Sequence, residues 1–192
     1  MYLFIDPIGP NIVLTGIEWT MEMWTREIEK WGDFDYFPDE LVDIVDNENI
    51  KEIWCVCGPA AFTRIRIVTL AINTLHLVRE IPIKWCHFFD IIDTGNPILK
   101  ANEREYIIDV WHGETKLIAK EEISDWTYHG YGEKNDFTGE KVYIEYKRNI
   151  HWICKIFLQK EPISKLSPIY LKDPHITWSK KSTSLSYEKM KK

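Results

Sequence analysis

The sequence lacks a long hydrophobic run, since no stretch approaches the roughly 18 consecutive apolar residues of a membrane-spanning helix. This absence predicts a soluble protein. The sequence also lacks an excess of positive charge, because 30 acidic residues outnumber 24 basic ones and the net charge is −6. Neutralising phosphates is the usual source of non-specific affinity for nucleic acids, so this balance argues against general nucleic-acid binding.

Cysteine is sparse, and its spacing is not that of a zinc site. The sequence contains Cys55, Cys57, Cys86 and Cys154. No secretory leader is recognisable, so we expect reduced thiols in a cytoplasmic protein. Cys55 and Cys57 stand two apart in a strand-like run and would face the same way as Ile53. We interpret them as small buried hydrophobes, with a metal pair as the weaker alternative.

Paired histidines are also missing, which excludes one kind of metal site. A metal held by two histidines one helical turn apart would need a spacing that none of the six histidines shows. The histidines are His76, His87, His112, His129, His151 and His175. Cys86 and His87 do not form a nucleophile pair either, because adjacent residues on a strand face opposite ways. We therefore predict no metal-binding residues.

What the sequence has is a globular balance with many aromatic residues. Hydrophobic residues make up 45% and charged residues 28% of the chain, with 9 Trp, 9 Tyr and 8 Phe. A chain of 192 residues can bury a core without metal or disulfides. Residues 179–192 are rich in Ser and Lys with little to bury, so we expect a mobile tail there.

Hydrophobic periodicity predicts an α/β protein. We expect strands over 1–5, 11–19, 21–31, 50–57, 82–89, 106–111, 116–120 and 142–146, and helices over 38–49, 63–80 and 150–158. Gly95 and Pro97 mark a boundary between two parts of the chain. Residues 33–48 hold seven acids and no Lys or Arg, which indicates either a solvated acidic face or a surface for a basic partner.

The helix expected over residues 63–80 carries two neighbouring apolar stripes. Val68, Ala71, Ile72, Leu75 and Val78 form one of them, and Ile67, Leu70, Thr74 and Leu77 form the other. Two stripes are wider than one contact with a sheet requires. Either the helix is buried inside the domain, or its second stripe meets another protein.

The stretch "GPAAFTRIRI" precedes this helix and resembles the central signature of the TsaB (YeaZ) family of bacterial tRNA-modification proteins. That signature reads Gly-Pro-Gly-Ser-Phe-Thr-Gly, one further residue, then Arg-Ile-Gly. The residues kept in register are Gly58, Pro59, Phe62, Thr63, Arg66 and Ile67. The opening "YLFIDPIGPNIVLTGIEW", the segment "ILKANEREYIIDVW" and the later "SPIYLKDPHITW" resemble further family segments in the same order.

The resemblance implies a fold and a role. The fold would be the actin-like (ASKHA, RNase H-like) α/β fold with two related subdomains, here 1–95 and a smaller 96–178. The role would be that of a non-catalytic subunit, without cofactor, that dimerises with the catalytic subunit TsaD. With the ATPase TsaE, that assembly forms threonylcarbamoyladenosine in tRNA. The family's partner interface carries over to Ile67, Leu70, Ala71, Thr74 and Leu77.

Where the sequence departs from the family, it argues against phosphate binding. Asp6 keeps the acid of the first hairpin, but Pro7 donates no backbone hydrogen bond and Ile8 offers no hydroxyl. In the central signature, two Gly positions and one Ser position become Ala60, Ala61 and Arg64. We therefore expect the Gly-Pro turn to be a structural corner, in which Phe62 fills the core and Thr63 caps the helix.

Two other functions stay open at this stage. One is a drifted homodimeric interaction protein that uses the same helix and has no role in tRNA modification. The other is a small ATP-dependent enzyme of the actin-like fold. The basic tail, with Lys180, Lys181, Lys189, Lys191 and Lys192, serves either as a solubilising terminus or as a tRNA contact.

Overall fold

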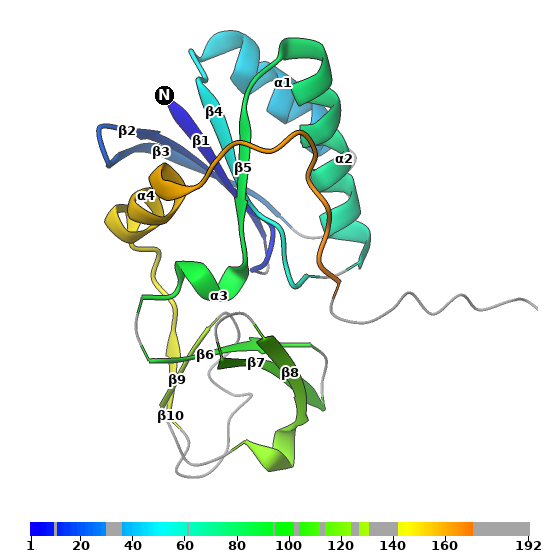
Figure 1. Cartoon of the computed structure of the whole chain (residues 1–192), viewed down its shortest axis with the longest axis vertical. Helices are drawn as coiled ribbons and strands as arrows, with labels where there is room; N and C mark the ends of the chain where they lie inside the picture. Colours follow the sequence, from blue (N-terminus) through cyan, green and yellow to red (C-terminus); the bar gives the residue numbers. More distant parts are fainter. Residues whose placement is uncertain are drawn as a thin grey trace, which may run out of the picture.

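The computed structural model contains two five-stranded sheets, one above the other in Figure 1. It describes residues 1–9, 11–29, 36–60, 62–93, 95–101, 104–111, 114–123, 127–130 and 142–170. The first sheet contains β1 (Tyr2–Asp6), β2 (Ile12–Glu18), β3 (Met21–Ile28), β4 (Glu52–Val56) and β5 (Ile83–Cys86). The second contains β6 (Asn96–Lys100), β7 (Glu105–Trp111), β8 (Glu114–Ala119), β9 (Thr127–Gly130) and β10 (Val142–Glu145).

The two sheets repeat one topology. The strand order is β3-β2-β1-β4-β5 in the first sheet, and the second has the equivalent order β8-β7-β6-β9-β10. In each sheet, three strands form an antiparallel meander, and the first of them pairs in parallel with a fourth, which pairs in parallel with a fifth. The relation between two α/β halves that the sequence resemblance implied is therefore present.

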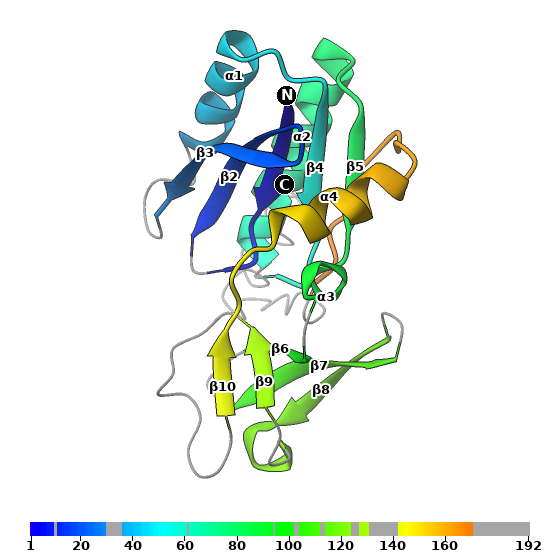
Figure 2. The same cartoon turned by 90° about the vertical axis from the view of Figure 1, so that its left-hand side faces the viewer.

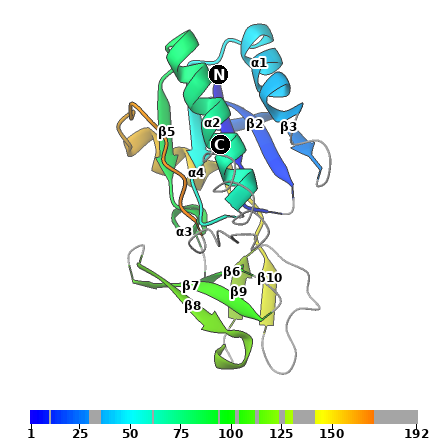
Figure 3. The same ribbon diagram turned by 90° about the vertical axis from the view of Figure 1, so that its right-hand side faces the viewer.

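Helices cover both faces of the first sheet (Figures 2 and 3). Helices α1 (Phe37–Asn47) and α2 (Phe62–Arg79) lie on one face, and α4 (Ile150–Gln159) lies on the other. Strand β4 shows why, because Ile53, Cys55 and Cys57 face α1 and α2 while Trp54 and Val56 face α4. A strand that is apolar on both faces needs a cover on each. The predicted burial of Cys55 and Cys57 on one face is confirmed.

Helix α4 packs on the first sheet although it follows the strands of the second. Its Phe157 ring stacks on Trp54 at 5.2 Å between centroids and meets Phe4 edge-on at 5.9 Å. Farther along, the backbone of Ile163 donates to the carbonyl of Ile83. Residues 150–170 thus contact the first sheet, although the division expected from the sequence placed them within 96–178. The reason is the second apolar face of the first sheet, which α4 covers.

The second sheet has a small core of its own, formed by Ile98, Tyr106, Ile118, Ile123 and Tyr128. The short helix α3 (Phe88–Ile91) precedes this sheet, and the 3-10 turn η2 (Lys120–Glu122) follows β8. Strand β6 includes Pro97, where the sequence indicated only a boundary. Pro97 stands near the start of the strand, which is where a sheet tolerates proline. Within the described residues, no helix has the length and apolarity to cross a membrane.

Candidate functional site: the outer face of helix α2

Helix α2 buries one stripe and leaves the other uncovered in this chain. Val68, Ile72 and Leu75 pack in the core beneath the helix. On the outer side, Leu70 is 69% exposed and Leu77 is 81% exposed. Of the two alternatives drawn from the sequence, a helix buried on both stripes is therefore wrong for the described part of the chain.

The other residues of the expected interface lie around these two leucines. Thr74 is exposed, whereas Ile67 and Ala71 are half-buried. Val78, which the periodicity assigned to the inner stripe, is 68% exposed. It stands in the last turn of α2, beyond the part of the helix that the sheet covers.

An apolar groove runs between α1 and α2, which lie side by side in Figure 3. Its volume is about 540 Å³. Helix α1 contributes Pro38, Leu41 and Val42, and α2 contributes Ile67, Leu70, Ala71, Thr74, Leu75, Val78 and Arg79. We call this the α1/α2 groove. Exposed apolar surface of this kind is characteristic of protein–protein contacts.

Arginines beside this groove form ion pairs with acidic residues of the same chain. Arg79 pairs with Asp46 at 2.7 Å, and Arg26 pairs with Glu40 at 2.6 Å. Two acids of the run over residues 33–48 therefore meet arginines of the same chain. Residues 33–35 lie outside the described part. Apart from Thr74 and Arg79, the described residues that line the groove are apolar.

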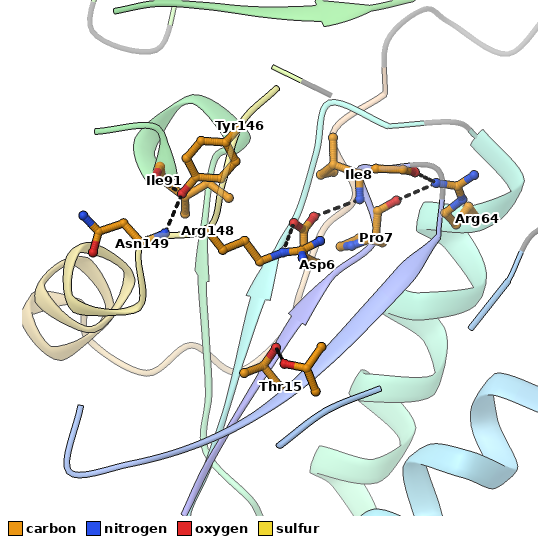
Figure 4. Close-up of polar contacts among 11 residues, drawn as sticks. Asp6, Pro7, Ile8, Thr15, Arg64, Ile91, Tyr146, Arg148 and Asn149 are labelled. Carbon is orange, nitrogen blue, oxygen red and sulfur yellow. Dashed lines mark hydrogen bonds and ion pairs between the residues drawn. The ribbon is translucent and has the colours of Figure 1, made fainter. Parts of the chain in front are cut away.

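Residues of the first hairpin form hydrogen bonds with other parts of the same chain, as Figure 4 shows. The Asp6 side chain is fully buried. Its Oδ1 accepts from the backbone N–H of Ile8 at 3.0 Å, and its Oδ2 accepts from Nε of Arg148 at 3.3 Å. The acid that the sequence analysis identified thus serves as an internal anchor for the segment between β10 and α4.

Arg64 fastens the same hairpin from the side of α2. Its guanidinium is buried and donates to the backbone carbonyls of Pro7, at 3.1 Å, and Gly9. Burial lowers the pKa of the Arg64 guanidinium, and the charge of Asp6 opposes this shift. In the sequence, Arg64 is recognisable only as a departure from the family pattern, and its role as a donor to this hairpin was missed. The signal for this role in the sequence was a large cationic side chain at a position where the family has Gly.

The Gly-Pro turn is a packing corner. Gly58 has φ +124°, and a Cβ there would lie 2.3 Å from the carbonyl oxygen of Ile169. The backbone of Ile169 donates to Cys57, and the N–H of Phe88 donates to the carbonyl of Gly58, both at 2.8 Å. Only glycine allows this close approach of two chain segments. The buried Pro59 completes the corner.

Two expectations for this turn are wrong. Helix α2 begins at Phe62, so the exposed Thr63 is already inside the helix and is not its N-cap. Phe62 is half-buried rather than a core residue, and its ring lies 4.9 Å from that of Tyr170. The segment after α4 returns to the start of α2, where its Tyr170 packs against Phe62 at the surface. The guanidinium carbon of the exposed Arg66 lies over the same Phe62 ring, 5.0 Å from its centroid.

The four cysteines and His87 lie in structural positions in the described part of the chain. All four cysteines are buried and unpaired with one another. A hydrogen bond with Cys57 and burial raise the pKa of the Cys55 thiol, and burial raises the pKa of Cys86. His87 caps α3 by accepting from the N–H of Phe89. Among the residues described, no three His, Cys, Asp or Glu side chains come together as metal ligands.

Comparison with solved structures identifies the fold. One similar structure is that of an uncharacterized protein with similarity to peptidase YeaZ from Pseudomonas aeruginosa, at 14% identity and a TM-score of 0.65. The alignment covers 89% of this chain and 99% of that one. YeaZ from Pseudomonas aeruginosa is also similar, at 14% identity and a TM-score of 0.52, over 67% of this chain and 74% of that chain. No protein-family model and no curated protein matches the sequence.

These similar structures define the fold class of the chain. It has the actin-like α/β fold of the YeaZ-like structures, as the sequence resemblance implied. The repeated strand order of the two sheets is the structural basis of that assignment.

Proposed function

We propose that this chain is a non-catalytic partner subunit of the TsaB (YeaZ) type, and that it binds a TsaD-like catalytic subunit through the α1/α2 groove. One observation carries the proposal. The stripe of α2 formed by Leu70 and Leu77 is exposed beside a groove of about 540 Å³. The sequence resemblance carries the family's interface with TsaD over to this helix. Bringing this apolar surface out of water would supply the binding energy.

The first hairpin supports the non-catalytic part of the proposal. The carbonyls of Pro7 and Gly9 accept from Arg64, and both carboxylate oxygens of Asp6 have partners within the chain. In this role the chain has no cofactor of its own. A TsaE-like ATPase and the tRNA would meet it only through the assembled complex.

Helix α1 supports the proposal as well. In the structure α1 runs from Phe37 to Asn47 and forms one wall of the groove with Pro38, Leu41 and Val42. A partner helix lying in the groove would therefore contact both α1 and α2.

The experiment is size-exclusion chromatography with light scattering on this chain alone and mixed with the TsaD-like subunit of the same organism. We expect a one-to-one species from the wild-type chain. The double variant Leu70→Asp/Leu77→Asp should lower the affinity at least about 100-fold, because each charge would have to be buried in an apolar contact.

The matched control is Val110→Asp/Leu158→Asp, since both of these residues are 51% exposed and lie on β7 and α4, away from the groove. It should bind like the wild type. Circular dichroism would verify that both variants are folded. Unchanged binding by the folded Leu70→Asp/Leu77→Asp variant would refute the role of the groove, and absence of any complex with the wild-type chain would refute the proposed partner.

A homodimeric interaction protein is the second candidate, and the distribution of charge favours it. Helix α1 carries Asp39, Glu40, Asp43 and Asp46 and no basic residue, whereas α2 carries basic residues and no acidic one. Arg79 and Asp46 already pair within the chain, but the exposed Asp39 and Asp43 of α1 and Arg66 of α2 form no ion pair among the described residues. Across a two-fold axis, these acids of one copy would meet Arg66 of the other. A homodimer that persists when the TsaD-like subunit is added would support this candidate over the first.

A further inference from the structure

A second groove lies on the other side of α2, against the segment that follows α4. This segment runs alongside α2 in Figure 1. The groove has a volume of about 400 Å³ and includes Phe62, Arg66, Asn73, Lys165 and Tyr170 among its lining residues. We call it the second groove.

Hydrogen bonds hold the wall of the second groove in place at three points. The N–H of Ile163 donates to the carbonyl of Ile83 at 2.8 Å. Asn73 then makes two bonds with Leu166, donating from Nδ2 to its carbonyl at 3.1 Å and accepting from its N–H at 2.8 Å. The N–H of Ile169 donates to the carbonyl of Cys57 at 2.8 Å. The position of Lys165 on this wall is therefore set by the fold.

Two cations, Arg66 and Lys165, stand at the rim of the second groove, and both are exposed. Among the described residues, no Asp or Glu lines this groove and neither cation forms an ion pair. By contrast, Arg79 and Arg64 on the same helix have acceptors in the chain.

The second groove adjoins the α1/α2 groove. Ile67 and Leu70 line both grooves, so they form an apolar ridge between them. A partner that covers Leu70 from the α1/α2 groove would also reach the rim where Arg66 and Lys165 lie.

We propose that the second groove is the outer half of the partner interface, and that it receives a helix of the partner subunit whose carboxylate side chains pair with Arg66 and Lys165. This inference rests on the proposed function and adds the chemistry of the partner's contact. The apolar ridge favours a protein over a nucleic acid, because RNA affinity depends on many phosphate contacts and two cations supply few of them. Charges at the rim of an apolar interface fix its register and raise the association rate.

The test compares two double charge reversals in binding to the TsaD-like subunit of the same organism, measured by isothermal titration calorimetry at low and high salt. Arg66→Glu/Lys165→Glu reverses the two rim cations. Lys116→Glu/Lys155→Glu is the matched control, since these exposed lysines on β8 and α4 lie away from both grooves. We expect the first variant to bind about tenfold more weakly at low salt, with a smaller difference at high salt, and the control to bind like the wild type.

The outcomes separate this inference from the proposed function. If Arg66→Glu/Lys165→Glu binds like its control while Leu70→Asp/Leu77→Asp does not bind, the second groove lies outside the interface and the inference is overturned. If Arg66→Glu/Lys165→Glu weakens only self-association, the occupant is a second copy of this chain. If it weakens only the binding of tRNA by the chain alone, the occupant is RNA. Either result overturns the inference. Lys165→Glu alone repeats the test should the double variant fold poorly.

Discussion

Arg64 is joined to Gly9 across 55 residues of chain by a hydrogen bond from its buried guanidinium to the backbone carbonyl. A second bond reaches the carbonyl of Pro7. The first turn of α2 is thereby tied to the hairpin between β1 and β2, which sets the position of the helix that carries the exposed stripe. The same residue links the stability of the fold to the placement of the candidate interface.

Replacing Arg64 with Met should lower the free energy of unfolding by about 1–3 kcal/mol, because two buried carbonyls would lose their donor. Urea denaturation at neutral pH would measure it. Arg66→Met is the control on the same helix. Arg66 is exposed, so the change there should stay within about 0.5 kcal/mol. Equal losses in the two variants would contradict the role assigned to Arg64.

The buried pair of Asp6 and Arg148 should show strong coupling. Arg148→Met removes one ion-pair partner of the fully buried Asp6 carboxylate, and we expect the free energy of unfolding to fall by about 2–4 kcal/mol. Asp6→Asn/Arg148→Met should lose less than the sum of the two single variants. A double-mutant cycle by urea denaturation measures this difference, and strictly additive losses would show that the pair contributes nothing beyond its separate residues.

Stability at alkaline pH should depend on Tyr146. Burial raises the pKa of its phenol to about 12 from 10.0, and its hydroxyl donates to the carbonyl of Ile91 at 2.6 Å. The unfolded chain therefore loses this proton at a lower pH than the folded chain, so stability falls as pH rises from about 10 to about 12. The slope contributed by one such group is at most about 1.4 kcal/mol per pH unit.

Tyr146→Phe should remove this contribution and show a shallower fall across the same window. Urea denaturation of both proteins at about pH 8 and about pH 11 would measure it. Every other titratable residue is the same in the two proteins, so the comparison isolates Tyr146. At about pH 8 the variant should be about 1 kcal/mol less stable than the wild type, because the bond to Ile91 is lost. Parallel falls in the two proteins would contradict the prediction.

Much of the fold could be predicted from local patterns. The three-stranded opening, helices α1, α2 and α4, and a central strand apolar on both faces follow from periodicity and residue type, and the structure has each of them within a few residues. The strands β6 and β9 were missed because Pro97 and the glycines near β9 indicate turns. The outer stripe of α2 was also visible in the sequence, although its exposure was not.

What the sequence determined by itself was which residues are apolar and how they repeat, and this was enough for the element order and for the two stripes of α2. The tertiary structure alone decided which stripe is covered, that α4 returns to the first sheet, and that Lys165 lines the same groove as Arg66. These features depend on contacts such as that of Asn73 with Leu166, which are 93 residues apart. Periodicity reports the neighbours of a residue along the chain, whereas burial and charge pairing depend on segments that only the folded chain brings together.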